Sequence, residues 1–224
     1  TAVALAREGA DVIVSDVLDL KDTEEDVKAM QRKVLAIKCD VSKKDEVDSL
    51  VQAAIQQFGK INILVNSVGI TGGYGKQNIE DLTEEEWDHI YNVNVKSNYY
   101  ILQAVLPHMK EQKYGKIVLL SSLAARVGGV KSGSAYVSSK GAVMSLVKSV
   151  WSKVAPYSIY INAINPGVTE TPILEDNVYP DSLFPLGRIG KPEDLAEAAV
   201  FLCSQASNYI TGMTLDVCGG FWVN

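Results

Sequence analysis

The sequence predicts an α/β fold in which a doubly wound parallel sheet is covered by helices on both faces. Two observations carry this prediction. Short apolar runs rich in β-branched residues alternate along the chain with longer stretches whose apolar residues recur at helical spacing. The apolar runs also lack the alternation of polar and apolar residues that marks a strand with one solvent face, so both faces should be buried. Strands that alternate with helices in this way form right-handed crossovers and therefore a parallel sheet.

Each element follows from its own local pattern. The runs bounded by turn residues are expected to be strands, at 12–15, 34–37, 61–65, 116–120, 159–164 and 213–217. Stretches with helical spacing predict helices at 1–8, 43–58, 84–109, 134–154 and 192–204. Thr83 followed by Glu86 predicts a capping box, and Pro192 suits the first turn of a helix.

The start of the chain departs from a regular dinucleotide-binding pattern. A helix is expected before the first strand, and the sequence contains no turn of the form G-x-G-x-x-G. In a dinucleotide-binding sheet that turn follows the first, central strand and holds the pyrophosphate at a helix N-terminus. We therefore expect the native polypeptide to carry about 15–25 further N-terminal residues, enough for one strand and one turn. The alternative is a chain that begins at Thr1 and folds with a rearranged sheet.

Composition restricts the class of protein. A chain of 224 residues, 47% hydrophobic and 21% charged, fits one globular domain over 1–224. A formal net charge of −6, with Lys and Arg scattered, makes nucleic acid a poor partner.

No apolar run approaches the ~20 residues that span a bilayer, so no membrane partner is expected. Three cysteines without Cys-x-x-Cys spacing indicate reduced thiols in a cytoplasmic protein. His89 and His108 have no ligand-spaced partners, so no metal site is expected.

A tyrosine and a lysine one helical turn apart are the first candidates for chemistry. Among ten tyrosines, only Tyr136 has a lysine, Lys140, four residues later, which places both on one helix face. Alone the spacing is weak, because any amphipathic helix with a surface Tyr and Lys shows it. The context strengthens the assignment of this pair to an active site, since the preceding strand ends at Ser121 and Ser122. Open α/β sheets place their ligands where strand carboxyl ends meet helix N-termini.

With these motifs, the chain resembles the short-chain dehydrogenase/reductase family from Thr1 to its C-terminus. The segments that carry the resemblance are Asp40-Val41, Asn66-Ser67-Val68-Gly69, Asn92-Val93-Asn94, Ser121-Ser122, Tyr136-x-x-x-Lys140, Asn165-Pro166-Gly167 with Thr171, Pro185-Leu186-Gly187-Arg188 and Gly219-Gly220. The resemblance implies a Rossmann-like fold and hydride transfer between NAD(H) and a secondary alcohol, polyol or ketone. It also implies a catalytic group of Ser122, Tyr136, Lys140 and Asn94.

Elementary chemistry supports these roles. To accept an alcohol proton near neutral pH, a tyrosine must lose about three units from its ordinary pKa of ~10. The Lys140 ammonium is expected to supply part of that, and the positive ring of an oxidised nicotinamide more. Ser122 can donate a hydrogen bond to the substrate oxygen as charge develops there. Asn94 is expected to keep its helix bent around a water that relays protons to Lys140; the alternative is a polar residue that caps a local kink.

The residues expected to bind the cofactor follow the strand ends. Asp16 closes the first expected strand, where a carboxylate binds two ribose hydroxyls but repels a 2′-phosphate, and Val17 adds no compensating charge. NAD is therefore expected rather than NADP, the alternative being an Asp that caps a turn. The resemblance adds Asp40 at the adenine amino group and Val41 against its ring. It also implies cofactor contacts at Asn66, Gly69, Tyr136, Lys140, Pro166, Gly167, Val168 and Thr171.

Two departures from the family pattern leave alternatives open. Asn66-Ser67-Val68-Gly69 stands where the family usually has Asn-Asn-Ala-Gly, which should tighten the adenosine pocket. The loop from Ser122 to Tyr136 looks about one residue longer than expected, so Ser121 competes with Ser122 as the residue that faces the substrate. We assign Ser122.

Two classes of function follow. In the first, the protein is an oxidoreductase acting on a small alcohol or ketone, and the resemblance implies a homotetramer or homodimer formed through the helices at 84–109 and 134–154. In the second, it is a catalytically silent relative, a scaffold or binding protein that keeps the site residues without holding a dinucleotide. Binding of NADH distinguishes the two classes.

Overall fold

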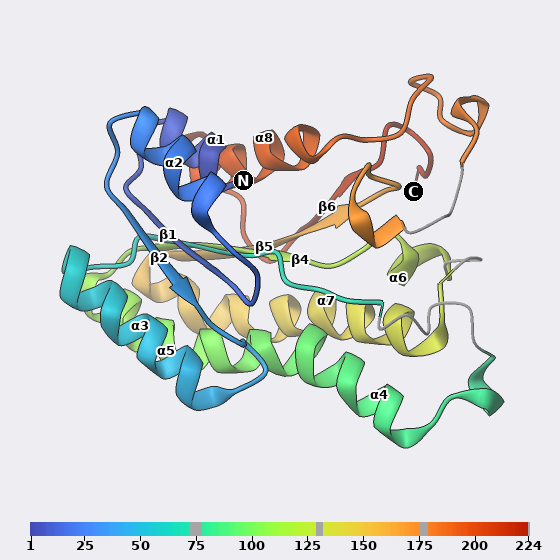
Figure 1. Cartoon of the computed structure of the whole chain (residues 1–224), viewed down its shortest axis with the longest axis horizontal. Coiled ribbons are helices and arrows are strands. Elements are labelled where there is room, and N and C mark those ends of the chain that lie inside the picture. Colours follow the sequence, from blue (N-terminus) through green and yellow to red (C-terminus); the bar gives the residue numbers. More distant parts are fainter. Residues whose placement is uncertain (72–77, 129–131, 175–178, 224) are drawn as a thin grey trace.

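A computed structural model of the chain describes residues 1–71, 78–128, 132–174 and 179–223 (Figure 1). The strands are β1 (Val12–Asp16), β2 (Val34–Lys38), β3 (Ile63–Asn66), β4 (Gly115–Leu120), β5 (Ile159–Pro166) and β6 (Thr214–Val217). The α-helices are α1 (Ala2–Arg7), α2 (Lys21–Ala29), α3 (Lys44–Phe58), α4 (Glu84–Tyr91), α5 (Ser97–Gln112), α6 (Ala124–Val127), α7 (Ser134–Val154) and α8 (Pro192–Cys203). A π-helical turn, η2 (Asn92–Lys96), joins α4 to α5. Short 3₁₀ turns lie at Ile79–Asp81, Ala155–Tyr157, Pro172–Leu174, Asp181–Leu183 and Gln205–Ser207.

In the part of the chain that the structure describes, the strands are all parallel and form two sheets. One has the order β1-β2 and the other β3-β4-β5-β6. Val12 of β1 pairs with Val34 of β2, and Asp16 and Lys38 are opposite at the carboxyl ends of these strands. In the larger sheet the register between β4 and β5 runs from Gly115–Ile159 to Leu120–Ile164. The predicted parallel α/β architecture is therefore confirmed. Within the described residues β1 pairs only with β2, and β3 only with β4.

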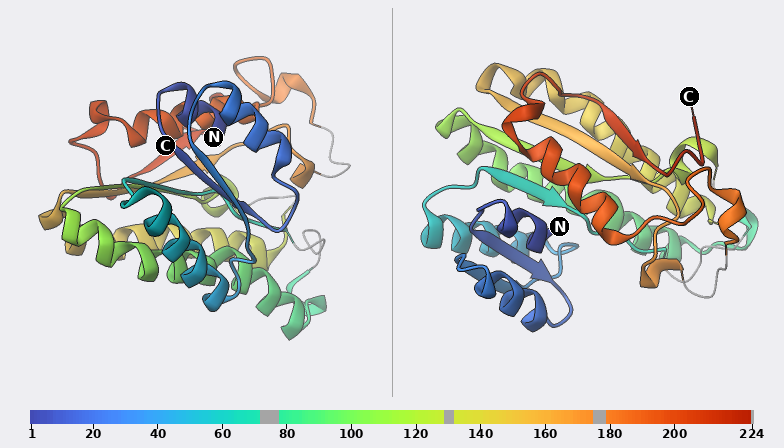
Figure 2. Two further views of the ribbon diagram at one scale, coloured as in Figure 1. Left: turned by 60° about the vertical axis from the view of Figure 1, so that its left-hand side comes forward. Right: turned by 90° about the horizontal axis from the view of Figure 1, so that it is seen from above.

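Helices cover both faces of the strands. In Figures 1 and 2, α1, α2 and α8 lie on one side, and α3, α4, α5 and α7 lie on the other. The largest apolar cluster is built by α3, α5 and α7 against β4 and β5, and partly buried Ile13 and Ile37 join it from the smaller sheet. A second cluster packs α8 on the larger sheet, and a third, around Val14 and Val27, packs α1 and α2 on β1.

Most element boundaries agree with the sequence prediction within one or two residues, but the helix expected at 84–109 is interrupted. It consists of α4, the π turn and α5, and it continues to Gln112. The capping box at its start is confirmed, because the main-chain N–H of Glu86 donates to Thr83 Oγ1 at 3.2 Å and that of Thr83 to Glu86 Oε2 at 2.9 Å. Among the described residues no helix is both long and apolar enough to cross a membrane.

Candidate active site

The predicted catalytic residues come from three elements that meet beside the carboxyl end of β4. Ser121 and Ser122 follow that strand directly, Tyr136 and Lys140 occupy the first turns of α7, and Asn94 belongs to the π turn. Helix α7 packs along β4 and β5 through Val143 and Val147, which are fully buried in the largest apolar cluster. This packing fixes the face of α7 that carries Tyr136 and Lys140.

Tyr136 is half-buried and hydrogen-bonds with Ser122. Burial raises the pKa of its hydroxyl above 10, and the hydrogen bond with Ser122 opposes that rise without cancelling it. Nζ of Lys140 lies 6.0 Å from the centroid of the Tyr136 ring. The expected lowering of the tyrosine pKa is therefore not produced by the protein groups alone, because the loss of hydration outweighs their stabilisation of the phenolate.

Lys140 is only 3% exposed, and burial lowers its pKa from 10.5 to about 8. Its Nζ donates to the carbonyl oxygens of Leu120 at 3.0 Å and Val68 at 3.4 Å. Gly69 makes room for this ammonium: a Cβ at position 69 would lie 2.5 Å from Nζ. The lysine is thus fixed between the end of β4 and the segment after β3.

Asn94 is fully buried, and its side chain reaches out of its own helix. Nδ2 donates to the carbonyl of Ile70 at 2.9 Å and to Ser139 Oγ at 3.0 Å, and Oδ1 accepts from the main-chain N–H of Ile70 at 2.8 Å. Ser139 in turn donates to the carbonyl of Tyr136 at 2.7 Å. Asn94 therefore links the segment after β3 to the first turn of α7.

The two adjacent serines have different surroundings. Oγ of Ser121 donates to the carbonyl of Lys140 at 2.7 Å, which ties the end of β4 to α7. Oγ of Ser122 accepts from the main-chain N–H of Ala124 at 3.1 Å and hydrogen-bonds with Tyr136. Of the two, Ser122 is the one placed at the tyrosine hydroxyl.

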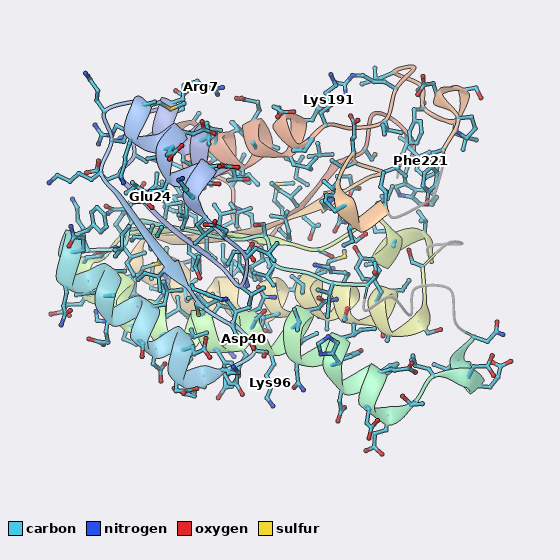
Figure 3. The ribbon with its side chains drawn as sticks, viewed as in Figure 1. Arg7, Glu24, Asp40, Lys96, Lys191 and Phe221 are labelled. Carbon is cyan, nitrogen blue, oxygen red and sulfur yellow. The ribbon has the colours of Figure 1, made fainter. Side chains whose placement is uncertain are left out.

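The predicted adenosine-binding residues lie at the carboxyl ends of β1 and β2. Asp16 is exposed, and one of its oxygens accepts from the main-chain N–H of Leu18 at 3.1 Å. The Asp40 carboxylate accepts from Ser42 Oγ at 2.6 Å, and this hydrogen bond lowers its pKa. Figure 3 shows Asp40 where the chain turns from β2 towards α3. Val41 packs against the largest apolar cluster.

Sequence reasoning missed a cation beside Asp16. Lys38 is the last residue of β2 and is opposite Asp16 in the register, so both side chains emerge at the same sheet edge. The sequence contains a signal for this pair, because each residue comes directly after an expected strand and the carboxyl ends of neighbouring parallel strands lie at one edge of the sheet. Only the pairing of β1 with β2 brings them together.

The predicted nicotinamide-side residues follow β5. Gly167 packs against the end of β6, because a Cβ at position 167 would lie 2.8 Å from Cα of Cys218. The main-chain N–H of Gly167 donates to the carbonyl oxygen of Val217 at 2.9 Å. Pro166 is the last residue of β5, and the Val168 carbonyl accepts from the Gly190 N–H at 2.9 Å. Oγ1 of Thr171 donates to the carbonyl of Thr169 at 3.2 Å. This segment is thus held by the end of β6 and by Gly190, two residues before α8.

Asn66, another predicted cofactor residue, is buried at the end of β3 and is engaged by the protein. Its Nδ2 donates to Oδ1 of Asn98 at 2.9 Å, and its Oδ1 accepts from the N–H of Val68 at 3.3 Å. Sequence reasoning missed Asn98, although it lies one helical turn after Asn94.

A third feature that sequence reasoning missed is a hydrogen-bonded group that joins α6, β5 and β6. Asp216 Oδ1 accepts from Arg126 Nε at 2.9 Å and from Asn165 Nδ2 at 2.8 Å. Arg126 lies in the short helix after Ser122, Asn165 precedes Pro166, and Asp216 belongs to β6. The sequence offers no local signal for this contact, because the residues are far apart along the chain.

Comparisons with known proteins find relatives that match almost the whole chain. Residues 1–222 match a family model described as enoyl-(acyl carrier protein) reductase. The chain is 34% identical over 229 residues to the 3-oxoacyl-(acyl-carrier-protein) reductase of Thermotoga maritima, covering 98% of the chain and 91% of that protein. It is 35% identical over 228 residues to the 2-dehydro-3-deoxy-D-gluconate 5-dehydrogenase of Dickeya dadantii, covering 98% and 88%.

The fold has solved counterparts as well. The crystal structure of 3-ketoacyl-(acyl-carrier-protein) reductase from Brucella melitensis complexed with NADH matches with a TM-score of 0.90 and 37% identity, covering 99% of this chain and 92% of that one. The class defined by fold and relatives is a Rossmann-like oxidoreductase. Within that class, the chain belongs to the short-chain dehydrogenase/reductase family.

Proposed function

We propose that this protein transfers a hydride reversibly between NAD(H) and a secondary alcohol, polyol or ketone, with Tyr136 as the acid/base. The supporting observation is the meeting of Ser122, Tyr136 and Lys140 at the end of β4. Ser122 hydrogen-bonds with Tyr136, and Nζ of Lys140 lies 6.0 Å from the centre of the tyrosine ring. Asn94 is bonded to the turn of α7 between them through Ser139.

Each of these side chains has a separate role in the proposed reaction. Ser122 donates a hydrogen bond to the substrate oxygen, and the Tyr136 hydroxyl exchanges a proton with the same oxygen atom. Lys140 holds a proton that it can release near neutral pH, because burial lowers its pKa to about 8. When bound, the nicotinamide supplies the hydride acceptor for oxidation and the hydride donor for reduction.

The strand ends fit a dinucleotide. The exposed carboxylate of Asp16 is suited to two ribose hydroxyls, Asp40 to the adenine amino group and Val41 to its ring. Gly69 lies against Lys140, and Pro166, Gly167, Val168 and Thr171 at and after the end of β5 are the residues that we propose for the nicotinamide end of the cofactor. We propose NAD over NADP because a 2′-phosphate would meet the Asp16 carboxylate, although Lys38 lies across from it.

We also propose that one domain, residues 1–224, carries both cofactor and catalytic residues, and that it assembles as a homotetramer or homodimer in the cytoplasm. The helices α5 and α7 each present a large apolar side chain to solvent, with Tyr99 of α5 51% and Trp151 of α7 41% exposed. Such faces suit contacts between subunits. Light scattering that shows a monomer at micromolar concentration would contradict this assembly.

The first test of the function is cofactor binding and turnover. In calorimetric titrations the protein should bind NADH, and should bind NADPH more weakly. A panel of ketones, polyols and sugar acids, followed by absorbance at the NADH band, should contain a substrate. Tyr136→Phe should lower kcat by about 10³-fold, because it removes the hydroxyl that exchanges the proton and leaves the ring in place.

Tyr157→Phe is the matched control, since Tyr157 is an exposed tyrosine in the 3₁₀ turn that follows α7, and its substitution should leave kcat unchanged. Activity that survives Tyr136→Phe would remove this residue from the reaction. A protein that binds no NADH at millimolar concentration would instead be the silent scaffold.

A further inference from the structure

Three buried asparagines form a chain of hydrogen bonds around Lys140. The central one is Asn98 in α5, which is 2% exposed. Its Nδ2 donates to the main-chain carbonyl of Asn94 at 2.8 Å, and its Oδ1 accepts from Nδ2 of Asn66 at 2.9 Å. One side chain therefore joins the π turn to the end of β3.

The bond to Asn94 acts on the π turn itself. In a regular α-helix the main-chain N–H of residue 98 donates to the carbonyl of residue 94. Here the side-chain amide of Asn98 reaches that same carbonyl. Since a π turn widens the helix and displaces its regular hydrogen bonds, a side-chain donor at this carbonyl stabilises the turn in the conformation that directs Asn94 outward.

The bond to Asn66 acts on the other side of Lys140. Asn66 accepts from the N–H of Val68, and the carbonyl of Val68 accepts from Nζ of Lys140 at 3.4 Å. The next residues are held by the π turn, because Asn94 binds both main-chain groups of Ile70. Val68 and Gly69 lie against the lysine, and the segment 68–70 is thus fixed at one end by Asn66 and at the other by Asn94.

We propose that Asn98 is a positioning residue for the catalytic lysine: by bonding Asn66 and Asn94 at once, it fixes the segment 68–70 against Lys140. It touches neither substrate nor cofactor, and it acts only through these neighbours. The proposal rests on the proposed function insofar as Lys140 takes part in proton transfer.

The test uses two substitutions in the whole protein. Asn98→Leu keeps the size of the side chain and removes both hydrogen bonds. Asn98→Asp keeps the acceptor for Asn66 and replaces the donor to Asn94 with an oxygen. For Asn98→Leu, kcat should fall by about 10- to 100-fold, with the KM for NADH little changed, because a misplaced catalytic group impairs the reaction more than binding. For Asn98→Asp, the ratio of variant to wild-type kcat should rise as the pH falls, since a protonated carboxyl can donate again.

The matched control is Asn162→Leu. Asn162 is 1% exposed in β5, and its amide bonds the main chain at Ile210 and Met213, away from Lys140. This variant should lose stability as Asn98→Leu does but should keep the wild-type kcat. If both variants lower kcat equally, or if neither does, Asn98 is not a positioning residue.

A second readout does not depend on activity. The main-chain amide of Ile70 donates to Asn94, so its hydrogen exchange should accelerate in Asn98→Leu and in Asn98→Asp but not in Asn162→Leu. If the wild-type protein shows no turnover, the proposed function is wrong. The hydrogen exchange of Ile70 then still tests whether Asn98 fixes residues 68–70. Unchanged exchange at Ile70 in an active protein would overturn the role of Asn98 alone. If Asn98→Leu does not fold, Asn98→Asp decides the question by the same two measurements.

Discussion

At the scale of single residues, the site is dominated by the loss of hydration around two titratable groups. Burial raises the pKa of Tyr136 and lowers that of Lys140, so it destabilises the charged form of each relative to water. The two carbonyl oxygens at Lys140 Nζ compensate only in part for the water that a free ammonium would have. The buried Lys140 ammonium thus lowers the stability of the folded protein at a position where an apolar side chain would raise it. Functional sites often lower stability in this way.

This cost gives a testable pH dependence of stability. Below pH 8 Lys140 is protonated in both the folded and unfolded states, and its burial costs the folded protein up to about 3 kcal/mol, from the difference between 10.5 and about 8. Between pH 8 and 10.5 the unfolded chain binds more protons than the folded one, so stability rises with pH. Lys140→Met should therefore raise the free energy of unfolding by about 1–3 kcal/mol at pH 7 and by much less at pH 10.5.

Urea unfolding at the two pH values measures this difference. The matched control is Lys148→Met, an exposed lysine on the same helix, which should change the stability by no more than about 0.5 kcal/mol at either pH. A Lys140→Met variant that is less stable than the wild type at pH 7 would show that the two carbonyl contacts outweigh the cost of burial.

At the scale of elements, the interrupted helix α4–η2–α5 matters most. Its start is set locally by the capping box of Thr83 and Glu86, and the sequence shows this pattern directly. Its interruption is set by contacts with other elements, because the side chain of Asn94 bonds Ile70 and Ser139. A helix start can therefore be predicted from four residues, whereas the π turn depends on β3 and α7 being in place.

The capping box of α4 should contribute measurably to the stability of the protein. Thr83→Ala removes the hydroxyl that accepts from the Glu86 N–H, and should lower the free energy of unfolding by about 1 kcal/mol. Glu86→Gln keeps an oxygen that can accept from the N–H of Thr83, so it should cost less. Thermal unfolding of the two variants checks the order. If Thr83→Ala is as stable as the wild type, α4 starts independently of its cap.

At the scale of the whole molecule, the division into two sheets has a dynamic consequence. β4 and β5 each have strands on both sides, whereas β1 and β2 form a two-stranded sheet within the described part of the chain. Two-stranded sheets are marginally stable alone. The smaller sheet depends on its own cluster around Val14 and Val27, and on Ile13 and Ile37 where these reach the main core.

Hydrogen exchange should therefore separate the two sheets. Main-chain amides of β1 and β2 should exchange faster than those of β4 and β5, because a local opening of the smaller sheet exposes less apolar surface. Exchange followed by mass spectrometry on peptides from the four strands tests this. Equal protection in all four strands would mean that the chain opens as one cooperative unit.

Much of this protein followed from the sequence alone. The periodicity of apolar residues predicted the strands and most helices, because burial on one or both faces depends on spacing that can be read locally. Tyr136 and Lys140 could be paired for the same reason, since residues four apart on a helix share a face. The carboxyl end of β4 could be predicted as the place of the site from the alternation of strands and helices.

Only the tertiary structure decided how these residues are used. The opposition of Asp16 and Lys38 depends on the register of two strands, and the Arg126–Asp216–Asn165 group depends on three distant segments meeting. Lys140 fits because position 69, in the segment after β3, is a glycine, and Asn98 reaches Asn66 only because α5 lies beside the end of β3. Hydrogen bonds and pKa values depend on distances of a few ångströms between such segments, and those distances are set by the packing of the whole chain.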